Sequence, residues 1–379
     1  MKKKFTAFFK NEIVLTVSVL LALASMFIVP PDQKYTEYIH WSTLSILMSL
    51  MLVMSGLKEL GIFKYLGRQL LRRQSRARSV MLILVGLCFF LSPFITNDVA
   101  LITFVPFTIF VLEYAGLRKH IVPTLSLQTI AAHMGSMISP VGNPHNIYLF
   151  ELMKETSGTT AGDFVGMMLP FFVIAGGLLA IFVFVLTIDN EAIMQRPYGK
   201  EMQFTGSASV RIAAYCILFA VSLLPVFGVI RYYFALAAVL TVIFLIDRKT
   251  LIRTDYSLLF TFMALFVLVG NLGRIQMIDD ALTGIVEGNE LLVSVIASQV
   301  ISNAPASILL SGFSDDYFAL ALGTDLGGLG TLIASMANLI SFKKYSEMKG
   351  ASPGNYILRF TAINAMFLLP MVIAAGLLF

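Results

Sequence analysis

The sequence predicts an all-α polytopic membrane protein made of two inverted-topology repeats. Hydrophobic residues make up 58% of the 379 residues and charged residues only 13%, whereas soluble domains are roughly 45–50% apolar. Nine apolar segments approach the length of about 20 residues that spans a bilayer. Two similar polar stretches, Ile95-Thr96-Asn97-Asp98 and Ile301-Ser302-Asn303-Ala304-Pro305, interrupt apolar sequence, one in each half of the chain.

The nine predicted full spans account for most of the chain. They lie near residues 13–29, 41–60, 121–150, 163–187, 211–229, 231–246, 256–272, 317–342 and 356–378. The first resembles a signal peptide, but its apolar run continues past Ala22-Leu23-Ala24 to Pro30-Pro31, so we interpret it as an uncleaved span. Residues 61–78, in which Arg alternates with apolar residues, form either an interfacial amphipathic helix or a basic loop.

Two further apolar regions have polar centres and predict re-entrant hairpins. Residues 79–116 break at Thr96-Asn97-Asp98 and residues 289–314 break at Ser302-Asn303. Irregular backbone survives at membrane depth only where it is buried in protein or lines a wet cavity. Basic residues flank the first hairpin on both sides, and acidic residues flank the second. By the positive-inside rule, the hairpins enter from opposite faces, with the N-terminus cytoplasmic and the C-terminus external.

The two halves match each other in order, as inverted repeats require. Thr96-Asn97 corresponds to Ser302-Asn303, and Val141-Gly142-Asn143 corresponds to Leu329-Gly330-Thr331. We assign residues 1–187 to an N-terminal repeat, 188–210 to a cytoplasmic linker and 211–379 to a C-terminal repeat. Such repeats are typical of secondary transporters, whose substrate site lies between them.

The spans at 121–150 and 317–342 should be broken helices, because Pro and Gly weaken their centres at 139–146 and 324–331. The N-terminus of a half-helix attracts an anion, and its C-terminus attracts a cation. The breaks and the hairpin tips supply the candidate substrate-binding residues, which are Thr96, Asn97, Gly142, Asn143, Pro144, Asn146, Ser302, Asn303, Gly328, Gly330 and Thr331. For the polar tips the alternative is helix capping, which Ser, Thr and Asn perform in any protein.

Asp98 and Asp325 are the candidate ion-coupling residues, because ionisable side chains at membrane depth are costly and mark functional sites. Each could carry a proton or bind a cation; the alternative is a carboxylate that caps a helix. His133, Ser136 and His145 are further candidates, although a single His in such a span is more often a packing residue.

The sequence lacks the signatures of an enzyme or an ATP-driven pump. It has no Walker lysine motif, no metal-ligand spacing and no cysteine pair. We therefore expect no enzyme activity and no cofactor other than Na⁺ or H⁺ as a coupling ion. The basic residues lie in short loops, where they are topology signals, so we expect no nucleic acid partner.

Four motifs carry a resemblance to a known family. They are Phe94-Ile95-Thr96-Asn97-Asp98-Val99-Ala100-Leu101, Gly142-Asn143-Pro144-His145-Asn146, Ser302-Asn303-Ala304-Pro305 and Gly323-Thr324-Asp325-Leu326-Gly327-Gly328. Together they resemble the ion transporter superfamily, in the branch of arsenite permeases, NhaD-type sodium/proton antiporters and small anion permeases. The resemblance implies two inverted repeats, each with a re-entrant hairpin and a discontinuous helix. Related dicarboxylate transporters, which carry Ser-Asn-Thr at both tips, are homodimers that work by an elevator motion.

We therefore expect a secondary active transporter in the inner (plasma) membrane. It would move a small anion, such as an arsenite-type oxyanion or a small organic anion, driven by a proton or sodium gradient. The alternative is a cation/proton antiporter that uses Asp98 and Asp325, and a third class is a channel or a membrane subunit of an ATPase. The expected partners are the lipid bilayer, the anion, the coupling cation and a second copy of the chain.

Overall fold

The computed structural model describes residues 13–63, 65, 69, 76–187 and 206–378, and these residues form helices joined by short connections. Most of the predicted interfacial segment at 61–78 and most of the linker at 188–210 lie outside the described residues. In chain order the first repeat contains α2 (Ile13–Ile28), η1 (Gln33–Thr36), α3 (Trp41–Glu59), α5 (Ala77–Ile95), α6 (Asn97–Tyr114), η2 (Arg118–His120), α7 (Ile121–Ser136), α8 (Pro144–Ser157) and α9 (Ala161–Leu186). The second contains α10 (Gly206–Leu223), α11 (Tyr232–Ile246), α12 (Arg248–Arg253), α13 (Ser257–Leu272), α14 (Gln276–Val286), α15 (Glu290–Ile301), α16 (Asn303–Leu310), α17 (Tyr317–Gly327), α18 (Met336–Ser346) and α19 (Pro353–Leu378).

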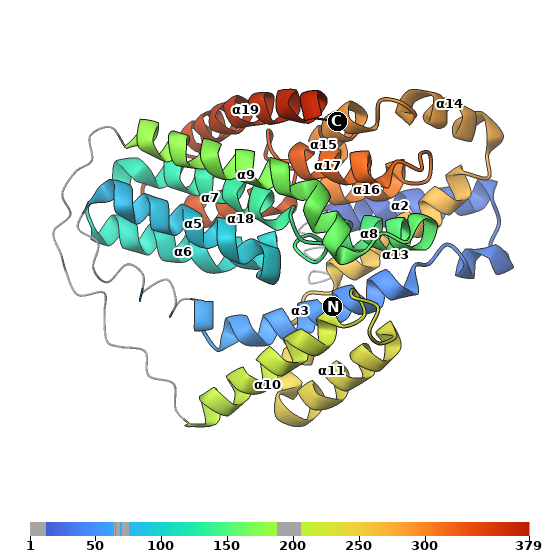
Figure 1. The fold of residues 1–379 in the computed structure, drawn as a ribbon, viewed down its shortest axis with the longest axis horizontal. Coiled ribbons are helices and arrows are strands. Elements are labelled where there is room, and N and C mark those ends of the chain that lie inside the picture. Colours follow the sequence, from blue (N-terminus) through green and yellow to red (C-terminus); the bar gives the residue numbers. More distant parts are fainter. Residues whose placement is uncertain (1–12, 64, 66–68, 70–75, 188–205, 379) are drawn as a thin grey trace.

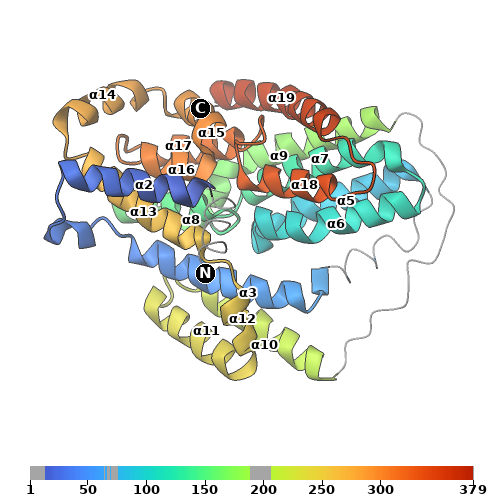
Figure 2. The same ribbon diagram turned by 180° about the vertical axis from the view of Figure 1, so that it is seen from behind.

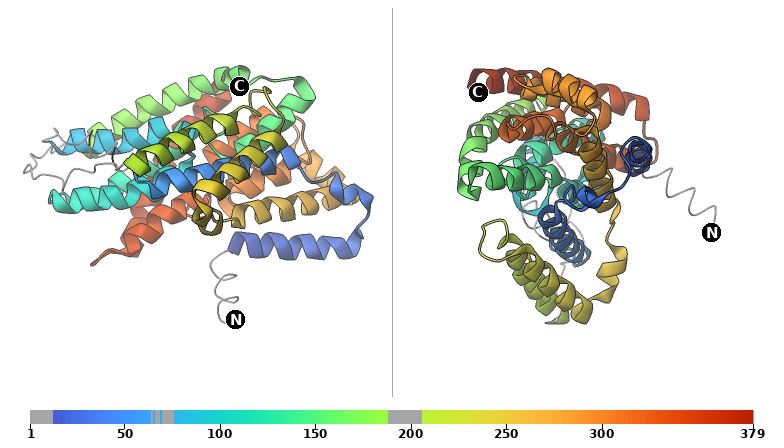
Figure 3. Two further views of the ribbon diagram at one scale, coloured as in Figure 1. Left: turned by 90° about the horizontal axis from the view of Figure 1, so that it is seen from below. Right: turned by 90° about the vertical axis from the view of Figure 1, so that its right-hand side faces the viewer.

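The same succession of elements occurs twice. A helix (α3 or α13) precedes a helical hairpin (α5/α6 or α15/α16), a pair of short helices (α7/α8 or α17/α18) and a helix of 26 residues (α9 or α19). The α6–α7 connection lies at one end of the molecule and the α16–α17 connection lies toward the other (Figure 1). The helix α2 packs against α13 (Figure 2), and α10 and α11 form a layer beside α3 (Figure 3). The all-helical fold class predicted from the sequence is confirmed.

Burial places the broken helices at the centre of the protein. Every residue of α7 is buried, and so is nearly every residue of α17. The long helices α9 and α19 instead leave large apolar side chains exposed, such as Ile181 and Leu369. Exposed apolar surface of this kind on a long helix suits contact with lipid. The first helix of each short pair, α7 or α17, is therefore enclosed by the rest of the protein.

Length and composition identify fewer spanning helices than the predicted nine. Among the described residues, five helical stretches are long and apolar enough to cross a bilayer alone: Gln33–Glu59, α5, α6, α9 and α19. The helices α13 and α14 pass the test together but are bent by 106°. The other helices are too short to qualify singly. For example, α7 has 16 residues and α8 has 14. The count of nine spans therefore stays a prediction.

The breaks lie a few residues away from their predicted positions. In the first repeat the gap is 137–143, so Pro144, His145 and Asn146 form the first turn of α8. In the second repeat the gap is 328–335, and the prediction of unwound backbone is wrong for 324–327, which is helical.

Close packing of α17 on α15 explains the second shift. A Cβ atom at Gly327 would lie 2.5 Å from the Ser298 Oγ, and one at Gly323 would lie 2.7 Å from the Leu291 carbonyl oxygen. Glycines four residues apart let two helices approach closely in a membrane. Gly323 and Gly327 therefore serve helix contact and do not unwind the helix.

Candidate functional site

The two hairpin tips share one unusual backbone conformation. Thr96 has φ 67° and ψ 152°, and Ser302 has φ 75° and ψ 150°. These are the only non-glycine residues with positive φ in the described ranges, and such a conformation costs on the order of 1–3 kcal/mol. An asparagine follows each and begins the second helix of the hairpin. The repeats therefore have equivalent tips at the level of the backbone.

Each tip is hydrogen-bonded to the break in its own repeat. The Asn97 amide donates to the Gly142 carbonyl at 3.2 Å, and the Asn303 amide donates to the Ala334 carbonyl at 2.9 Å. Gly142 thus corresponds structurally to Ala334, not to Gly330 as the sequence comparison of the halves indicates. In both tips the asparagine Oδ1 also accepts the next amide, at 2.7 Å from Asp98 and 3.0 Å from Ala304.

The tips and the breaks enclose a small central cavity. Its volume is about 30 Å³, and no Lys or Arg lines it among the residues that the structure describes. Asp98 and His145 are its ionisable lining residues. The remaining lining residues are Val14, Asn97, Pro144, Leu258, Thr261, Phe262, Ser302, Asn303, Ala304, Pro305, Ser335 and Met336. The cavity therefore draws on both repeats, on α13 and on α2.

Four helices begin at this cavity. The first residues of α6, α8, α16 and α18 are Asn97, Pro144, Asn303 and Met336, and all four line the cavity. Each helix N-terminus carries roughly half a positive elementary charge from the aligned peptide dipoles. Helix N-termini favour anions through the dipole and through free amides, but here the Asn97 and Asn303 amides already donate within the protein and Pro144 has none, so the dipole is the main contribution. The helix dipoles thus contribute positive potential to a cavity in which no Lys or Arg side chain is described and in which Asp98 carries the acidic group.

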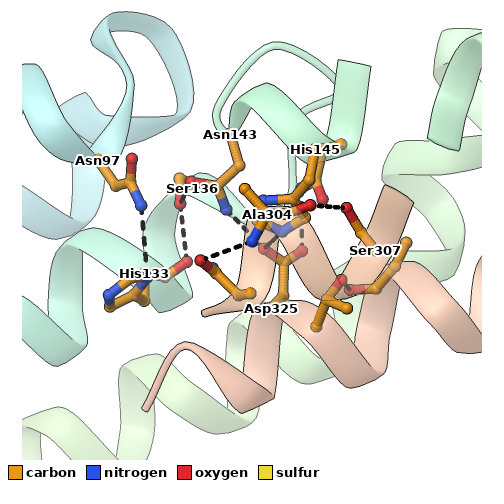
Figure 4. A network of polar contacts seen from close by, with 12 residues as sticks. Asn97, His133, Ser136, Asn143, His145, Ala304, Ser307 and Asp325 are labelled. Atoms are coloured by element: carbon orange, nitrogen blue, oxygen red, sulfur yellow. Dashed lines mark hydrogen bonds and ion pairs between the residues drawn. The ribbon is translucent and has the colours of Figure 1, made fainter. Parts of the chain in front are cut away.

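Asp325 lies beside the cavity in a closed polar network. Its side chain is fully buried. Its Oδ1 accepts from the Asn143 Nδ2 at 2.5 Å and contacts the His145 Nε2 at 3.1 Å, while its Oδ2 accepts from the Asn146 Nδ2 at 2.9 Å (Figure 4). Asn143 is itself held by Ser136, whose Oγ donates to the Asn143 Oδ1 at 3.0 Å. The carboxylate of α17 therefore binds the break and the first turn of α8 in the other repeat.

His133 connects the repeats in the other direction, from α7 of the first repeat to α18 of the second. Its Nε2 lies 3.1 Å from the Oδ1 of Asn338 on α18, which requires a proton on Nε2. Its Nδ1 then accepts a long bond of 3.4 Å from the Asn97 Nδ2 (Figure 4). Asn338 also donates to the carbonyls of Gly328 and Thr331 in the second break, at 2.9 and 2.8 Å.

The two cross-repeat connections occupy equivalent positions. Asn146 is the third residue of α8 and Asn338 is the third residue of α18. Each bonds a side chain near the end of the first half-helix of the opposite repeat, which is Asp325 for Asn146 and His133 for Asn338. One connection uses a carboxylate and the other a neutral imidazole. This asymmetry is the main chemical difference between the two halves of the site.

Sequence comparison assigns the chain to a family of transporters. The sequence model of the CitMHS family, described as citrate transporters, matches residues 5–316. The chain belongs to the citrate transporter family. It is 31% identical over 334 residues to an uncharacterized transporter of Methanocaldococcus jannaschii, with 87% of each chain covered. It is 29% identical over 340 residues to the inner membrane protein YbiR of Escherichia coli, again with 87% of each chain covered.

A solved structure shows the same fold. The YdaH transporter of Alcanivorax borkumensis, described as having an unusual topology, superposes with a TM-score of 0.63 at 14% identity. The match covers 96% of this chain and 98% of that one. The protein is therefore a multi-pass membrane transporter of the citrate transporter family, and its membership of the ion transporter superfamily is confirmed.

The structure divides the predicted site residues of this family member into three groups. Those that line the cavity are Asn97, Asp98, Pro144, His145, Ser302 and Asn303. Those outside the lining that form the tip contacts and the cross-repeat networks are Thr96, His133, Ser136, Gly142, Asn143, Asn146 and Asp325. Gly328, Gly330 and Thr331 lie in the second break and are not lining residues, although Gly328 adjoins Asn303 and His133. Their roles in binding or coupling stay predictions.

Several residues of the site were absent from the sequence prediction. Gln299 braces the second break, since its Nε2 donates to the carbonyls of Gly327 and Leu329 at 2.8 and 2.9 Å. Thr261 and Phe262 of α13 line the cavity but belong to an ordinary apolar span, which gives no signal. Asn338 could have been found, because it stands in α18 where Asn146 stands in α8.

Proposed function

We propose that this transporter moves a small anion that binds between the two hairpin tips, driven by a proton or sodium gradient. The observation that carries the proposal is the meeting of four helix N-termini at one cavity, in which no Lys or Arg occurs among the described lining residues. Such a site attracts negative charge but does not hold it as a buried Lys or Arg would. A transport site needs binding that is reversible on both sides of the membrane.

The size of the cavity supports a small substrate. Its 30 Å³ corresponds to about two or three water positions. In this conformation it suits an ion of a few heavy atoms, such as an inorganic oxyanion or one carboxylate group. The family description names citrate, which also presents carboxylate oxygens, so anionic oxygen is the common chemistry. A larger organic anion would require the tips to separate.

Asp98 is the coupling residue in this proposal. It lines the same cavity as the anion, and its carboxylate accepts no hydrogen bond within the described residues. Two like charges 4 Å apart repel by about 4 kcal/mol at an effective dielectric constant of 20. A proton or sodium ion on Asp98 removes this repulsion, so anion and cation bind together. Electrostatics alone would thus link uptake to the gradient.

Asp325 and His133 have a positioning role in the same proposal. Their bonds join the broken helices of the two repeats into one unit. An elevator-type mechanism would move this unit against the surrounding helices. The proposal therefore separates the two aspartates, which the sequence presents as equivalent candidates.

A cation/proton antiporter is the second candidate, and the presence of Asp98 in the cavity is the observation that favours it. Purified protein in liposomes distinguishes the two functions. We expect at least one labelled anion among arsenite, succinate and citrate to accumulate when a proton or sodium gradient is imposed. Proton-coupled sodium movement without accumulation of any of these anions would support the antiporter instead.

Binding of the same anions to the detergent-purified protein provides an independent check. A ligand that binds only the folded state raises the unfolding temperature, and the gain in stability grows with the logarithm of its concentration above the Kd. Asn303→Ala should abolish the rise, because it removes the side chain at the second tip. Gly177→Ala on α9 is the control, since its new Cβ meets no atom within 4 Å.

A further inference from the structure

A second cavity lies where the two repeats meet at the end of the molecule opposite the α16–α17 connection. It has a volume of about 240 Å³ and is lined by residues of η2, α7, α18, α19 and the α18–α19 connection. Among the described lining residues three are basic, Arg118, Lys119 and Arg359, and none is acidic. The cavity is thus several times larger than the central one. Its ionisable lining residues are basic, whereas those of the central cavity are Asp98 and His145.

The basic residues come from both repeats. Arg118 and Lys119 form η2, between the first hairpin and its broken helix, whereas Arg359 lies on α19. Arg118 donates to the carbonyl of Lys349, which holds η2 against the α18–α19 connection. Asn355 also lines the cavity one helical turn before Arg359, on the same face of α19. These contacts give the cavity fixed walls.

The two arginines of this cavity are poorly compensated within the described residues. Glu113 approaches Arg118 at 3.9 Å, but both side chains are about half exposed, so solvent screens the pair. Arg359 makes no hydrogen bond or ion pair with any residue that the structure describes. Guanidinium groups bind phosphate through paired N–H donors, and an ammonium adds a point charge.

Apolar side chains adjoin the basic ones. Ile357 and Leu358, between Asn355 and Arg359 on α19, are 42% and 72% exposed. This end of the molecule is also the one that the charge pattern assigns to the cytoplasmic face, where the leaflet is rich in anionic lipid. A ligand with a phosphate group and attached acyl chains would contact the basic residues and the exposed apolar side chains of α19 at the same time.

We propose that this cavity binds a phosphate group, and that an anionic phospholipid supplies it. The phosphate lies among Arg118, Lys119 and Arg359, and the acyl chains follow the exposed apolar face of α19. This inference is independent of the transported substrate. It implies that a lipid bridges η2 of the first repeat and α19 of the second.

The test measures the unfolding temperature of the full-length protein in a maltoside detergent, which carries no phosphate. Phosphatidylglycerol, diacylglycerol with the same acyl chains, and inorganic phosphate are titrated separately. We expect phosphatidylglycerol to raise the unfolding temperature increasingly with its concentration, and diacylglycerol to have no such effect. Stabilisation by inorganic phosphate alone would retain the site and make free phosphate its ligand.

Arg359→Gln and Lys343→Gln form the matched pair for this test. Each removes one positive charge at the same end of the molecule, but Lys343 is exposed and lies outside the cavity lining. Arg359→Gln should raise about tenfold or more the concentration of phosphatidylglycerol that gives a set rise in unfolding temperature. Lys343→Gln should leave this concentration unchanged. Equal stabilisation by phosphatidylglycerol and diacylglycerol, or equal behaviour of the two variants, would overturn the proposal.

Discussion

Replacing each aspartate by asparagine should separate their roles. Asp325 is fully buried and its two oxygens meet three side-chain nitrogens, at 2.5, 2.9 and 3.1 Å. In Asp325→Asn one carboxylate oxygen becomes an NH₂ group that faces another donor. The hydrogen bonds to the remaining oxygen are then no longer bonds to a charged acceptor. Breaking a buried network of this kind by changing one partner costs about 3–5 kcal/mol. Asp98→Asn removes no side-chain hydrogen bond within the described residues and should cost less than about 1 kcal/mol.

Thermal unfolding in detergent without substrate measures this difference. One kcal/mol corresponds to roughly 2–4 °C for domains of 150–250 residues and to somewhat less for a larger chain. We therefore expect Asp325→Asn to lower the unfolding temperature by on the order of 5–10 °C, and Asp98→Asn to change it by about 1 °C. Asp98→Asn should instead abolish the dependence of transport on the gradient. Equal unfolding temperatures for the two variants, or normal coupling in Asp98→Asn, would refute the reasoning.

Three further outcomes are expected. Asn97→Ala and Asn303→Ala should each reduce transport at least tenfold, because each removes a tip amide from the cavity; unchanged uptake in both would move the site elsewhere. Gly327→Ala should destabilise the protein by about 1–3 kcal/mol through overpacking against α15, whereas Gly177→Ala on α9 should not, as thermal unfolding can show. A protease-cleavable tag at the C-terminus should be cut from outside intact cells, and protection there would reverse the predicted topology.

The turns at the two tips were predictable because their signal is local, while the re-entrant course of the hairpins in the membrane stays a prediction. A polar tripeptide within apolar sequence has few stable solutions in a membrane, and both tips lie at the predicted residues. The positive φ of Thr96 and Ser302 was not predictable, since neither residue favours that conformation. It follows from the tertiary bonds that tie each tip to a break.

The second break shows where local signals mislead. Gly323 and Gly327 weaken an isolated helix, but in the protein they let α17 approach α15. Only knowledge of the neighbouring helix distinguishes these two effects. The cross-repeat bonds of His133 and Asp325 join residues more than 170 positions apart and have no local signature.

The aspartates illustrate the same limit for function. In the sequence both are single carboxylates in apolar surroundings. Asp98 follows Thr96-Asn97, and Asp325 lies in a glycine-rich motif. The structure places Asp98 at the cavity and encloses Asp325 among Asn143, His145 and Asn146. Their different roles depend on which groups surround them, and that depends on the pairing of the two repeats.

The most direct test of the central claim is anion accumulation in liposomes that contain the purified protein and carry an imposed proton or sodium gradient. We expect a labelled small anion to rise above its external concentration with the wild-type protein, and to equilibrate without accumulation in Asp98→Asn. Sodium movement coupled to protons, with no accumulation of arsenite, succinate or citrate, would contradict the account.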